Sequence, residues 1–311
     1  MMYLILAAGF ILLIKGADFF VDGSSSTAKR LNVPSLIIGM TVVAMGTSLP
    51  ETSVSVSASI ADKNGLSISN AVGSNIFNLM VVAGICCMLC AVPVNKETLK
   101  RDFPLSVAAA AMLLAMGAAD GDISRADGII LLAVFVVFLI IMVRSALKAR
   151  SSASADQEEE YKLLPAWKCI LYIVGGIIAI AVGGKMVVNG ASDIARSFGM
   201  SDTLIGMTIV ALGTSLPELV TSIVAARKRE IDMALGNVVG SNIFNILFVL
   251  GIASAISPIS FSAENIIDTA VLIAMSLLVL ILCFRKKKLV FWHGAVMVLL
   301  YAAYTVYLFV R

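Results

Sequence analysis

Charged side chains are scarce in this chain of 311 residues. Asp, Glu, Lys and Arg together make up 14% of it, whereas a soluble globular domain has about 25%. Hydrophobic residues supply 59% instead. The composition therefore excludes an ordinary soluble domain and predicts a chain that crosses a membrane several times.

Histidine is nearly absent, and the cysteines show no metal-binding spacing. The single histidine is His293, so the sequence offers neither a His-Glu-x-x-His zinc motif nor a nucleophile with a matching histidine. The five cysteines lie in or at the edge of apolar runs and are interpreted as packing residues. They are Cys86, Cys87, Cys90, Cys169 and Cys283. We therefore expect neither an enzyme nor a bound cofactor.

Apolar runs of about 20 residues, the length that spans a bilayer as a helix, recur along the chain. They predict an all-α membrane protein with about ten transmembrane helices. The expected helices lie near residues 2–26, 35–60, 66–91, 103–119, 125–146, 166–195, 202–227, 232–257, 265–284 and 288–309. The apolar start has no basic segment before it, so it is interpreted as the first span and not as a cleaved signal.

Basic residues gather in alternate loops, and the small net charge of +3 does not suggest a nucleic-acid partner. The basic loops contain Lys29 and Arg30; Lys96, Lys100 and Arg101; Arg144, Lys148, Arg150, Lys162 and Lys168; Arg227, Lys228 and Arg229; and residues 285–288. The other loops hold only Lys63, Arg125 and Arg196. By the positive-inside rule the first set is cytoplasmic, which places both termini outside the inner (cytoplasmic) membrane.

Two polar motifs each occur twice within apolar stretches. Gly-Thr-Ser-Leu-Pro-Glu covers 46–51 and 213–218, and Gly-Ser-Asn-Ile-Phe-Asn covers 73–78 and 240–245. The two offsets agree, since 218 − 51 and 241 − 74 both give 167. The sequence is therefore interpreted as a duplication of one membrane unit.

The position of the basic loops indicates that the two copies are inverted. The pair Lys29 and Arg30 precedes the first acid-bearing helix, whereas residues 227–229 follow the second. Five helices in each half would reverse the second copy, as in many secondary transporters. We expect a first repeat at 1–150, a polar cytoplasmic linker at 151–164 and a second, inverted repeat at 165–311.

The acids of the first motif are the strongest candidates for a site. Glu51 and Glu218 have no basic residue within a turn or two in the sequence, and acids kept in membrane segments usually serve a function. Helical spacing predicts that Thr47 and Ser48 share a face with Glu51. Thr214, Ser215 and Glu218 repeat that pattern.

Proline and amide residues extend the set of oxygen donors. Pro50 and Pro217 have no N–H and interrupt helical hydrogen bonding, which frees carbonyls near 44–47 and 211–214. The second motif adds Ser74 with Asn78, and Ser241 with Asn245, each pair one helical turn apart. Oxygen ligands without His, Cys or Met suit a hard cation such as Ca²⁺ or Na⁺.

Four further charged residues lie toward helix ends. Lys15, Asp18, Asp22 and Lys185 are interpreted as side chains that reach the interface or pair at a spacing of three residues. An ion pathway is the alternative interpretation.

At these residues the chain resembles the calcium/cation antiporter superfamily, in particular the prokaryotic sodium/calcium exchangers. The resemblance runs over roughly 16–91 and 183–258. It implies that Glu51 and Glu218 are the central Ca²⁺ ligands, shared with flanking Na⁺ sites, and that Thr47 and Thr214 offer backbone carbonyls to Ca²⁺. It also implies further Na⁺ ligands from Ser48, Ser215, Ser74, Ser241 and the carbonyls of Ala44 and Ala211, with Asn78 and Asn245 flanking the centre.

The resemblance also carries implications for mechanism. Potassium-dependent relatives, and some potassium-independent ones, have Asp at the position of Asn245. This departure argues against potassium co-transport and makes the cluster less acidic. The long first and sixth helices would slide over a fixed core to open the site to either side. We expect a secondary antiporter that exchanges Na⁺ for Ca²⁺, with the two ions and the lipid bilayer as its partners and no obligate protein partner.

Two alternatives stay open from the sequence. The same fold could exchange H⁺ for Ca²⁺ or another divalent cation, because carboxylates also carry protons. A cation channel is less favoured, because channels usually assemble rings of acids from several subunits.

Overall fold

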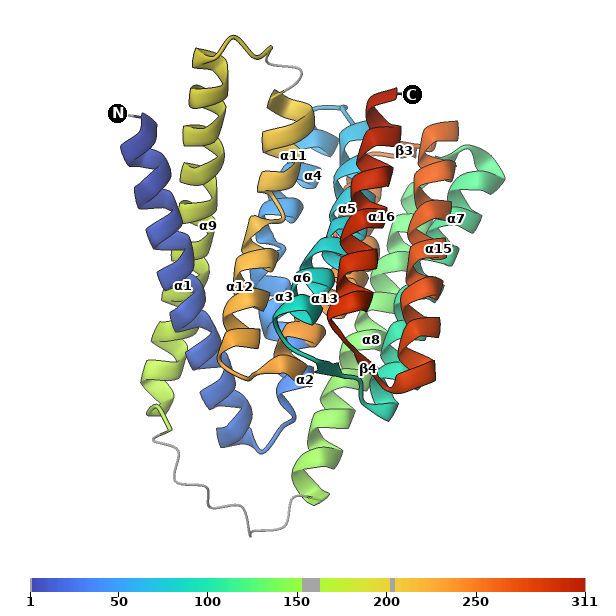
Figure 1. Cartoon of the computed structure of the whole chain (residues 1–311). Coiled ribbons are helices and arrows are strands. Elements are labelled where there is room, and N and C mark those ends of the chain that lie inside the picture. Colours follow the sequence, from blue (N-terminus) through green and yellow to red (C-terminus); the bar gives the residue numbers. More distant parts are fainter. Residues whose placement is uncertain (1, 153–162, 202–204, 311) are drawn as a thin grey trace. The chain divides into compact units, whose positions relative to one another are not determined.

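The structure is a computed structural model that describes residues 2–152, 163–201 and 205–310, and these residues are almost entirely helical (Figure 1). Eight of the described helices are long and apolar enough to cross a membrane. They are Met2–Leu31, Gly65–Leu89, Thr98–Asp120, Arg125–Ser151, Ala166–Ser197, Ile231–Ile256, Ala263–Phe284 and Phe291–Val310. The chain is a multi-pass membrane protein, as its composition predicts.

The other two expected spans, 35–60 and 202–227, are interrupted helices. The first consists of α2 (Ser35–Ile38), the π-helix η1 (Gly39–Val43), α3 (Ala44–Thr47) and α4 (Leu49–Ile60). The second consists of η4 (Gly206–Val210), α11 (Ala211–Gly213) and α12 (Leu216–Arg227), and residues 202–204 lie outside the described part. Ten spans therefore stay a prediction beside eight continuous helices.

The remaining elements are long helices, short π-helical segments and four two-residue strands. They are α1 (Met2–Leu31), α5 (Gly65–Phe77), η2 (Asn78–Val82), α6 (Ala83–Leu89), β1 (Val92–Pro93), η3 (Thr98–Asp102), α7 (Phe103–Asp120), β2 (Asp122–Ile123), α8 (Arg125–Ser152), α9 (Ala166–Ser197), α13 (Ile231–Phe244), η5 (Asn245–Leu250), α14 (Gly251–Ile256), β3 (Ile259–Ser260), α15 (Ala263–Lys286), β4 (Lys288–Leu289) and α16 (Phe291–Val310). Most of the expected linker, residues 153–162, lies outside the described residues.

The chain forms two compact units, and each draws on both halves of the sequence. The first unit comprises Met1–Thr47 and Phe138–Asn237, and the second comprises Ser48–Val137 and Val238–Arg311. These units differ from the expected repeats at 1–150 and 165–311. The repeats were inferred from recurring sequence motifs, whereas the units are defined by which segments pack together. The repeat boundaries stay a prediction.

In the first unit, glycines at seven-residue spacing join α1 to α9, which lie side by side in Figure 1. They are Gly9, Gly16 and Gly23 on α1, and Gly176, Gly183 and Gly190 on α9. A Cβ at Gly16 would lie 2.9 Å from the backbone nitrogen of Ile180, and a Cβ at Gly176 would lie 2.9 Å from the carbonyl oxygen of Gly16. Such small residues let two membrane helices approach at backbone distance.

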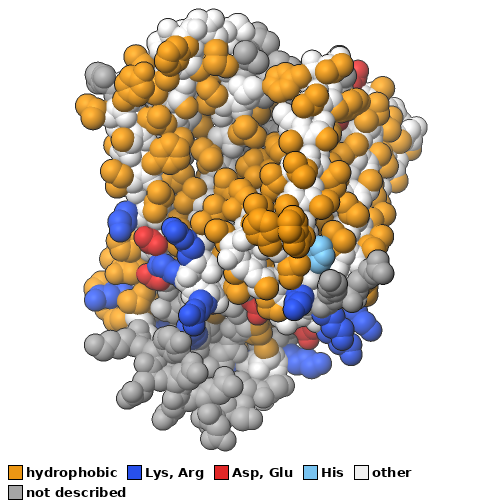
Figure 2. All heavy atoms as spheres, in the orientation of Figure 1, with side chains coloured by type: hydrophobic (Ala, Val, Ile, Leu, Met, Phe, Trp, Pro, Cys, Tyr) orange, Lys and Arg blue, Asp and Glu red, His pale blue; other side chains and the backbone are white. Residues whose placement is uncertain are grey.

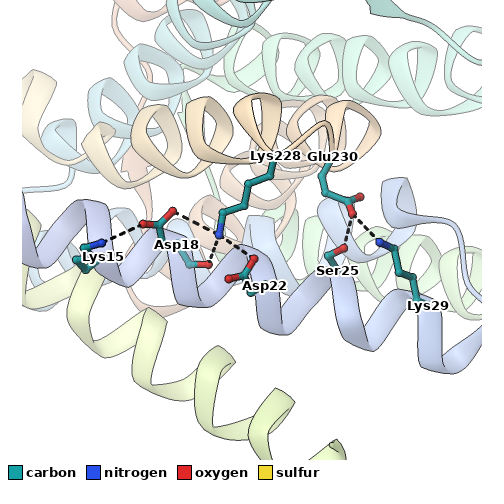
Figure 3. A network of polar contacts seen from close by, with 7 residues as sticks. All are labelled: Lys15, Asp18, Asp22, Ser25, Lys29, Lys228 and Glu230. Carbon is teal, nitrogen blue, oxygen red and sulfur yellow. Dashed lines mark hydrogen bonds and ion pairs between the residues drawn. The ribbon is translucent and has the colours of Figure 1, made fainter. Parts of the chain in front are cut away.

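Charged side chains attach α1 to the end of α12 (Figure 3). Lys228 Nζ lies 2.7 Å from Asp22 Oδ1 and 3.4 Å from Asp18 Oδ1. Beyond it, Glu230 accepts a hydrogen bond from Ser25 and lies 3.4 Å from Lys29 Nζ. Figure 2 shows these charges over α1 and α12 on a face otherwise covered mostly by apolar side chains.

The expected pairing at a spacing of three residues is confirmed for one pair, but the expected position toward a helix end is wrong, because both residues lie near the middle of α1. Lys15 Nζ lies 3.9 Å from Asp18 Oδ2, three residues further along α1. Helical spacing alone does not predict the second partner of Asp18. This partner, Lys228, directly follows α12 and lies 210 residues further along the chain.

The most buried membrane helices lie wholly or mainly in the second unit. Of the most apolar stretch in each, 72% is buried in Gly65–Leu89 and 78% in Ile231–Ile256. These two helices carry the Gly-Ser-Asn motif, so its polar residues lie in the interior of the protein. Two small antiparallel ladders lie in the same unit: Val92 faces Leu289 in β1 and β4, and Ile123 faces Ile259 in β2 and β3.

Candidate functional site

Both copies of the first motif break a helix at the same serine. Ser48 has φ −85° and ψ 13°, and Ser215 has φ −92° and ψ 6°. Each serine is followed by a short helix of 12 residues, with Pro50 or Pro217 within its first two positions. The predicted effect of the prolines is confirmed, because a residue without an N–H is tolerated in the first turn and not in a helix interior.

The break places each acid in the first turn of a new helix. Glu51 lies in the first turn of α4 and Glu218 in the first turn of α12, and both side chains are fully buried. Unpaired backbone N–H groups and the helix dipole favour a negative charge at such an end. The expected helix through Thr47 and Glu51 is not continuous, so helical spacing does not place these two side chains on one face.

Widened turns recur at matched positions of the two halves. The π-helices η1 and η4 precede the two breaks, and η2 and η5 begin at Asn78 and Asn245. Each of these π-helices in the second half starts 167 residues after its counterpart, as 206 − 39 and 245 − 78 show. Because π-helical turns are rare and occur often at functional sites, their repetition marks these segments as candidates.

In the first unit, threonine hydroxyls meet the carbonyls that were expected as ligands. Thr47 Oγ1 lies 3.3 Å from the carbonyl oxygen of Ala44, and Thr214 Oγ1 lies 3.3 Å from that of Ala211. Thr47 is fully buried, and so is Ala44. Ser215 is also buried in this unit, beside the acid of α12 in the sequence.

The two copies of the segment before the helix break differ in their exposure at the protein surface. Val43 is 1% exposed, whereas its counterpart Val210 is 41% exposed. Ala44 is buried, whereas Ala211 is exposed. A pocket of about 630 Å³ lies beside this segment and is lined by Val188, Asn189, Ser192, Asp193, Arg196, Ile205 and Val210. The second copy of the segment therefore lies partly at the protein surface, whereas the first copy is buried.

In the second unit, six predicted site residues are buried together with other amides. They are Ser48, Glu51, Ser74, Asn78, Ser241 and Asn245. Ser74 Oγ donates to Glu51 Oε1 at 3.4 Å, so the structure brings these two predicted site residues together. Within the described residues, neither polar atom of the Asn78 amide has a hydrogen-bond partner. Its buried oxygen suits cation coordination.

A reciprocal amide pair lies beside these residues. Asn75 Nδ2 donates to the carbonyl of Asn242 at 3.0 Å, and Asn242 Nδ2 donates to the carbonyl of Asn75 at 3.1 Å. Asn245 Nδ2 then donates to Asn75 Oδ1 at 3.1 Å. The amide of Asn245 is therefore anchored through its nitrogen, and its buried oxygen has no hydrogen-bond partner within the described residues.

Four residues near the acids were missed by the sequence interpretation. Asn70 and Asn237 contact the acid-bearing helices, and Ser55 and Ser222 are their partners there. The signal was present, because each residue type recurs at the offset of 167 in both copies, as 237 − 70 and 222 − 55 show. Comparing the halves residue by residue would have found them.

Comparison with known proteins identifies the family. The sequence pattern of the family described as "Sodium/calcium exchanger protein" matches residues 1–144 and 168–310. The chain belongs to this exchanger family. The resemblance inferred from the motifs is thereby confirmed, and cation exchange across a membrane is the activity of the family to which the chain belongs.

Individual members of the exchanger family match this chain over nearly its full length. The putative antiporter CaxA of Alkalimonas amylolytica is 41% identical, covering 90% of this chain and 89% of its own. The sodium/calcium exchanger MaX1 of Methanosarcina acetivorans is 33% identical, covering 99% and 98%. A solved structure of the sodium-calcium exchanger NCX_Mj, soaked with Na⁺ and Sr²⁺, has a TM-score of 0.85 at 34% identity, covering 97% and 96%.

Proposed function

We propose that this exchanger moves Na⁺ against Ca²⁺ across the inner membrane by alternating access, as a transporter without enzymatic activity or cofactor. The observation that carries the proposal is the helix break that occurs twice, at Ser48 and Ser215, with a buried acid in the turn that follows each. Buried acids at helix N-termini are suited to bind and release cations. Names of two relatives, the sodium/calcium exchangers MaX1 and NCX_Mj, support the choice of ions.

We assign the central cation-binding role to Glu51 and Glu218. Two carboxylates balance the charge of one Ca²⁺, and neutral oxygens supply the rest of its six to eight ligands. Those oxygens are proposed to come from Thr47, Thr214, Ser48, Ser215, Ser74, Ser241, Asn78, Asn245, Ala44 and Ala211. Divided among neighbouring positions, the same oxygens serve Na⁺, so the two cations compete for one set of acids.

Inverted repeats are part of the proposal, together with ten spans and extracytoplasmic termini. Reciprocal contacts support the symmetry: Val92 and Ile123 of the first half pair with Leu289 and Ile259 of the second. Ile259 is the counterpart of Val92 in the second half, and Leu289 lies within one residue of the counterpart of Ile123, since 259 − 92 is 167 and 289 − 123 is 166. Each ladder is therefore the counterpart of the other, with the two halves exchanged. A two-fold relation between the halves accounts for such an exchange.

Alternating access is supported by the unequal exposure of the two copies. Val210 and Ala211 are exposed at the protein surface, whereas Val43 and Ala44 are buried. Exchanging the environments of the two copies would close one side and open the other, which is the change that alternating access requires.

The proposal is tested with purified protein in sealed liposomes. We expect an outward Na⁺ gradient, at the same pH on both sides, to drive ⁴⁵Ca²⁺ uptake, and an equal K⁺ gradient to drive none. Ca²⁺ uptake that requires a pH gradient and does not depend on Na⁺ would show that the counter-ion is H⁺ and not Na⁺. Uptake that needs no counter-ion would indicate a channel.

Exchange of H⁺ for a divalent cation is the second candidate. It is favoured by the match to CaxA, which is described as a putative antiporter without a named sodium dependence. The neutral hydroxyls of Ser48, Ser74 and Ser215 near the acids favour Na⁺, because a proton needs no such ligands.

A further inference from the structure

Each acid-bearing helix is held by the amide of one asparagine from the following helix. Asn70 Nδ2 lies 3.2 Å from the carbonyl oxygen of Glu51 and 3.0 Å from Ser55 Oγ. In the other half, Asn237 Nδ2 lies 3.4 Å from the carbonyl oxygen of Glu218 and 2.9 Å from Ser222 Oγ. The same pair of contacts therefore forms twice, within different compact units.

The geometry of this contact restrains the turn that carries the acid. An Asn amide has two N–H donors, and its two acceptors here are separated by four residues, which is about one helical turn. A rotation of α4 about its axis, or a shift along it, would break both contacts. The restrained carbonyl belongs to the acid itself, so the backbone from which the carboxylate projects is fixed.

A second contact from the same helix holds the first carboxylate. Ser74 follows Asn70 by one helical turn on α5, and its hydroxyl donates to Glu51 Oε1 at 3.4 Å. Helix α5 thus contacts both the backbone and the side chain of Glu51. The direction of this carboxylate is set by α5 before any cation binds.

Asn237 has a further partner within the first unit. Thr47 Oγ1 lies 3.1 Å from Asn237 Oδ1, and Thr47 is the last residue of α3. Asn237 is 1% exposed, whereas Asn70 is half-buried. One amide therefore connects the turn of Glu218 to the segment of Thr47 inside the first unit, and its removal is expected to have the larger effect.

We propose that Asn70 and Asn237 are positioning residues that orient Glu51 and Glu218 for cation binding. The inference rests on the proposed function, which makes these acids the central ligands. Residues that hydrogen-bond to a metal-ligating group fix its orientation, and their loss typically weakens metal affinity by about 10- to 100-fold. A restrained carboxylate loses less conformational freedom when a cation binds.

The test is equilibrium binding of ⁴⁵Ca²⁺ to the purified full-length protein. Asn70→Leu and Asn237→Leu keep a similar side-chain volume and remove both donors. We expect the Kd for Ca²⁺ to rise by roughly tenfold for Asn70→Leu and more for Asn237→Leu. Ser55→Ala and Ser222→Ala remove one acceptor each, and we expect a smaller rise of roughly threefold.

The control variant is Asn265→Leu on α15. It removes a buried amide whose Nδ2 donates to the carbonyl oxygen of Ser260 at 3.5 Å. We expect it to leave the Kd unchanged. A purely structural role of Asn70 or Asn237 would lower the melting temperature without changing the Kd, and that result overturns the proposal. If a Leu variant fails to fold, an unchanged Kd in both Ser→Ala variants overturns it equally.

The outcome separates this inference from the proposed function. Wild-type protein that binds Ca²⁺, with the same affinity in all four variants, removes the positioning role and leaves the exchanger proposal intact. Wild-type protein that neither binds nor transports Ca²⁺ removes the proposed function instead.

Discussion

At the scale of residues, the two acids determine the chemistry. A charge within a membrane helix costs roughly 2.5–3.5 kcal/mol on insertion scales, and a helix N-terminus offsets about 0.3–1 kcal/mol of it. Glu51 and Glu218 are fully buried at such ends. In the proposed exchanger, a bound cation would offset the remaining cost, so that an occupied site would be more favourable than an empty one.

Neutralising either acid tests this account. We expect Glu51→Gln and Glu218→Gln each to lower Na⁺-driven ⁴⁵Ca²⁺ uptake by about 100-fold or more, because roughly 3 kcal/mol of charged coordination is lost. Glu97→Gln makes the same chemical change at an exposed acid and is expected to transport like wild type. Substantial uptake by either site variant would remove that acid from the centre.

At the scale of elements, the close approach of α1 to α9 depends on glycine residues, which have no side chain to keep the helices apart. Gly176 and Gly175 are neighbours on α9, and only the first meets the partner helix. A Cβ at Gly176 would lie 2.7 Å from Phe20 Cβ and 2.9 Å from the Gly16 carbonyl oxygen, whereas a Cβ at Gly175 would have no atom within 4 Å among the described residues. The glycines at seven-residue spacing therefore lie on the face of each helix that contacts the other helix.

The adjacent glycines provide a matched pair of variants. We expect Gly176→Ala to destabilise the protein by about 1–3 kcal/mol, because overpacking forces the helices apart. Its melting temperature and its rate of uptake are expected to fall. Gly175→Ala adds the same methyl group in open space and is expected to match or exceed wild-type stability. Equal melting temperatures for the two variants would contradict close packing at this seam.

At the scale of the whole molecule, the distribution of basic residues predicts orientation. The basic clusters include Lys29 and Arg30 in the last turn of α1, and residues 285–288 at the end of α15 and the start of β4. The positive-inside rule assigns such clusters to the cytoplasm. With an odd number of spans in each repeat, the N-terminus and the C-terminus are both expected on the side of the membrane opposite the cytoplasm.

Reporter fusions test this orientation. Alkaline phosphatase, which is active only outside the cytoplasm, is expected to be active when fused after residue 311 and inactive when inserted in the predicted linker at 151–164. Green fluorescent protein at the same two places is expected to show the opposite pattern. A fluorescent and phosphatase-inactive C-terminus would reverse the assignment.

Much of the site was predictable because its residues recur within the sequence. Glu51, Ser74 and Asn78 were found from a motif that occurs twice, and burial of these side chains is confirmed. Asn70 was not found, because an isolated asparagine in an apolar helix is also common as a packing residue. Its role depends on which carbonyl it reaches, and that carbonyl lies 19 residues away.

The order of residues alone was sufficient for the membrane class, the duplication and the helix breaks, because each follows from local chemistry: apolar length, repeated motifs, and a proline without an N–H. Packing in three dimensions decided the rest. It placed Lys228 against Asp18 and Asp22, joined the glycine faces of α1 and α9, and exposed Val210 while burying Val43. These contacts join segments far apart in the chain, and two nearly identical segments acquire different environments only through their neighbours.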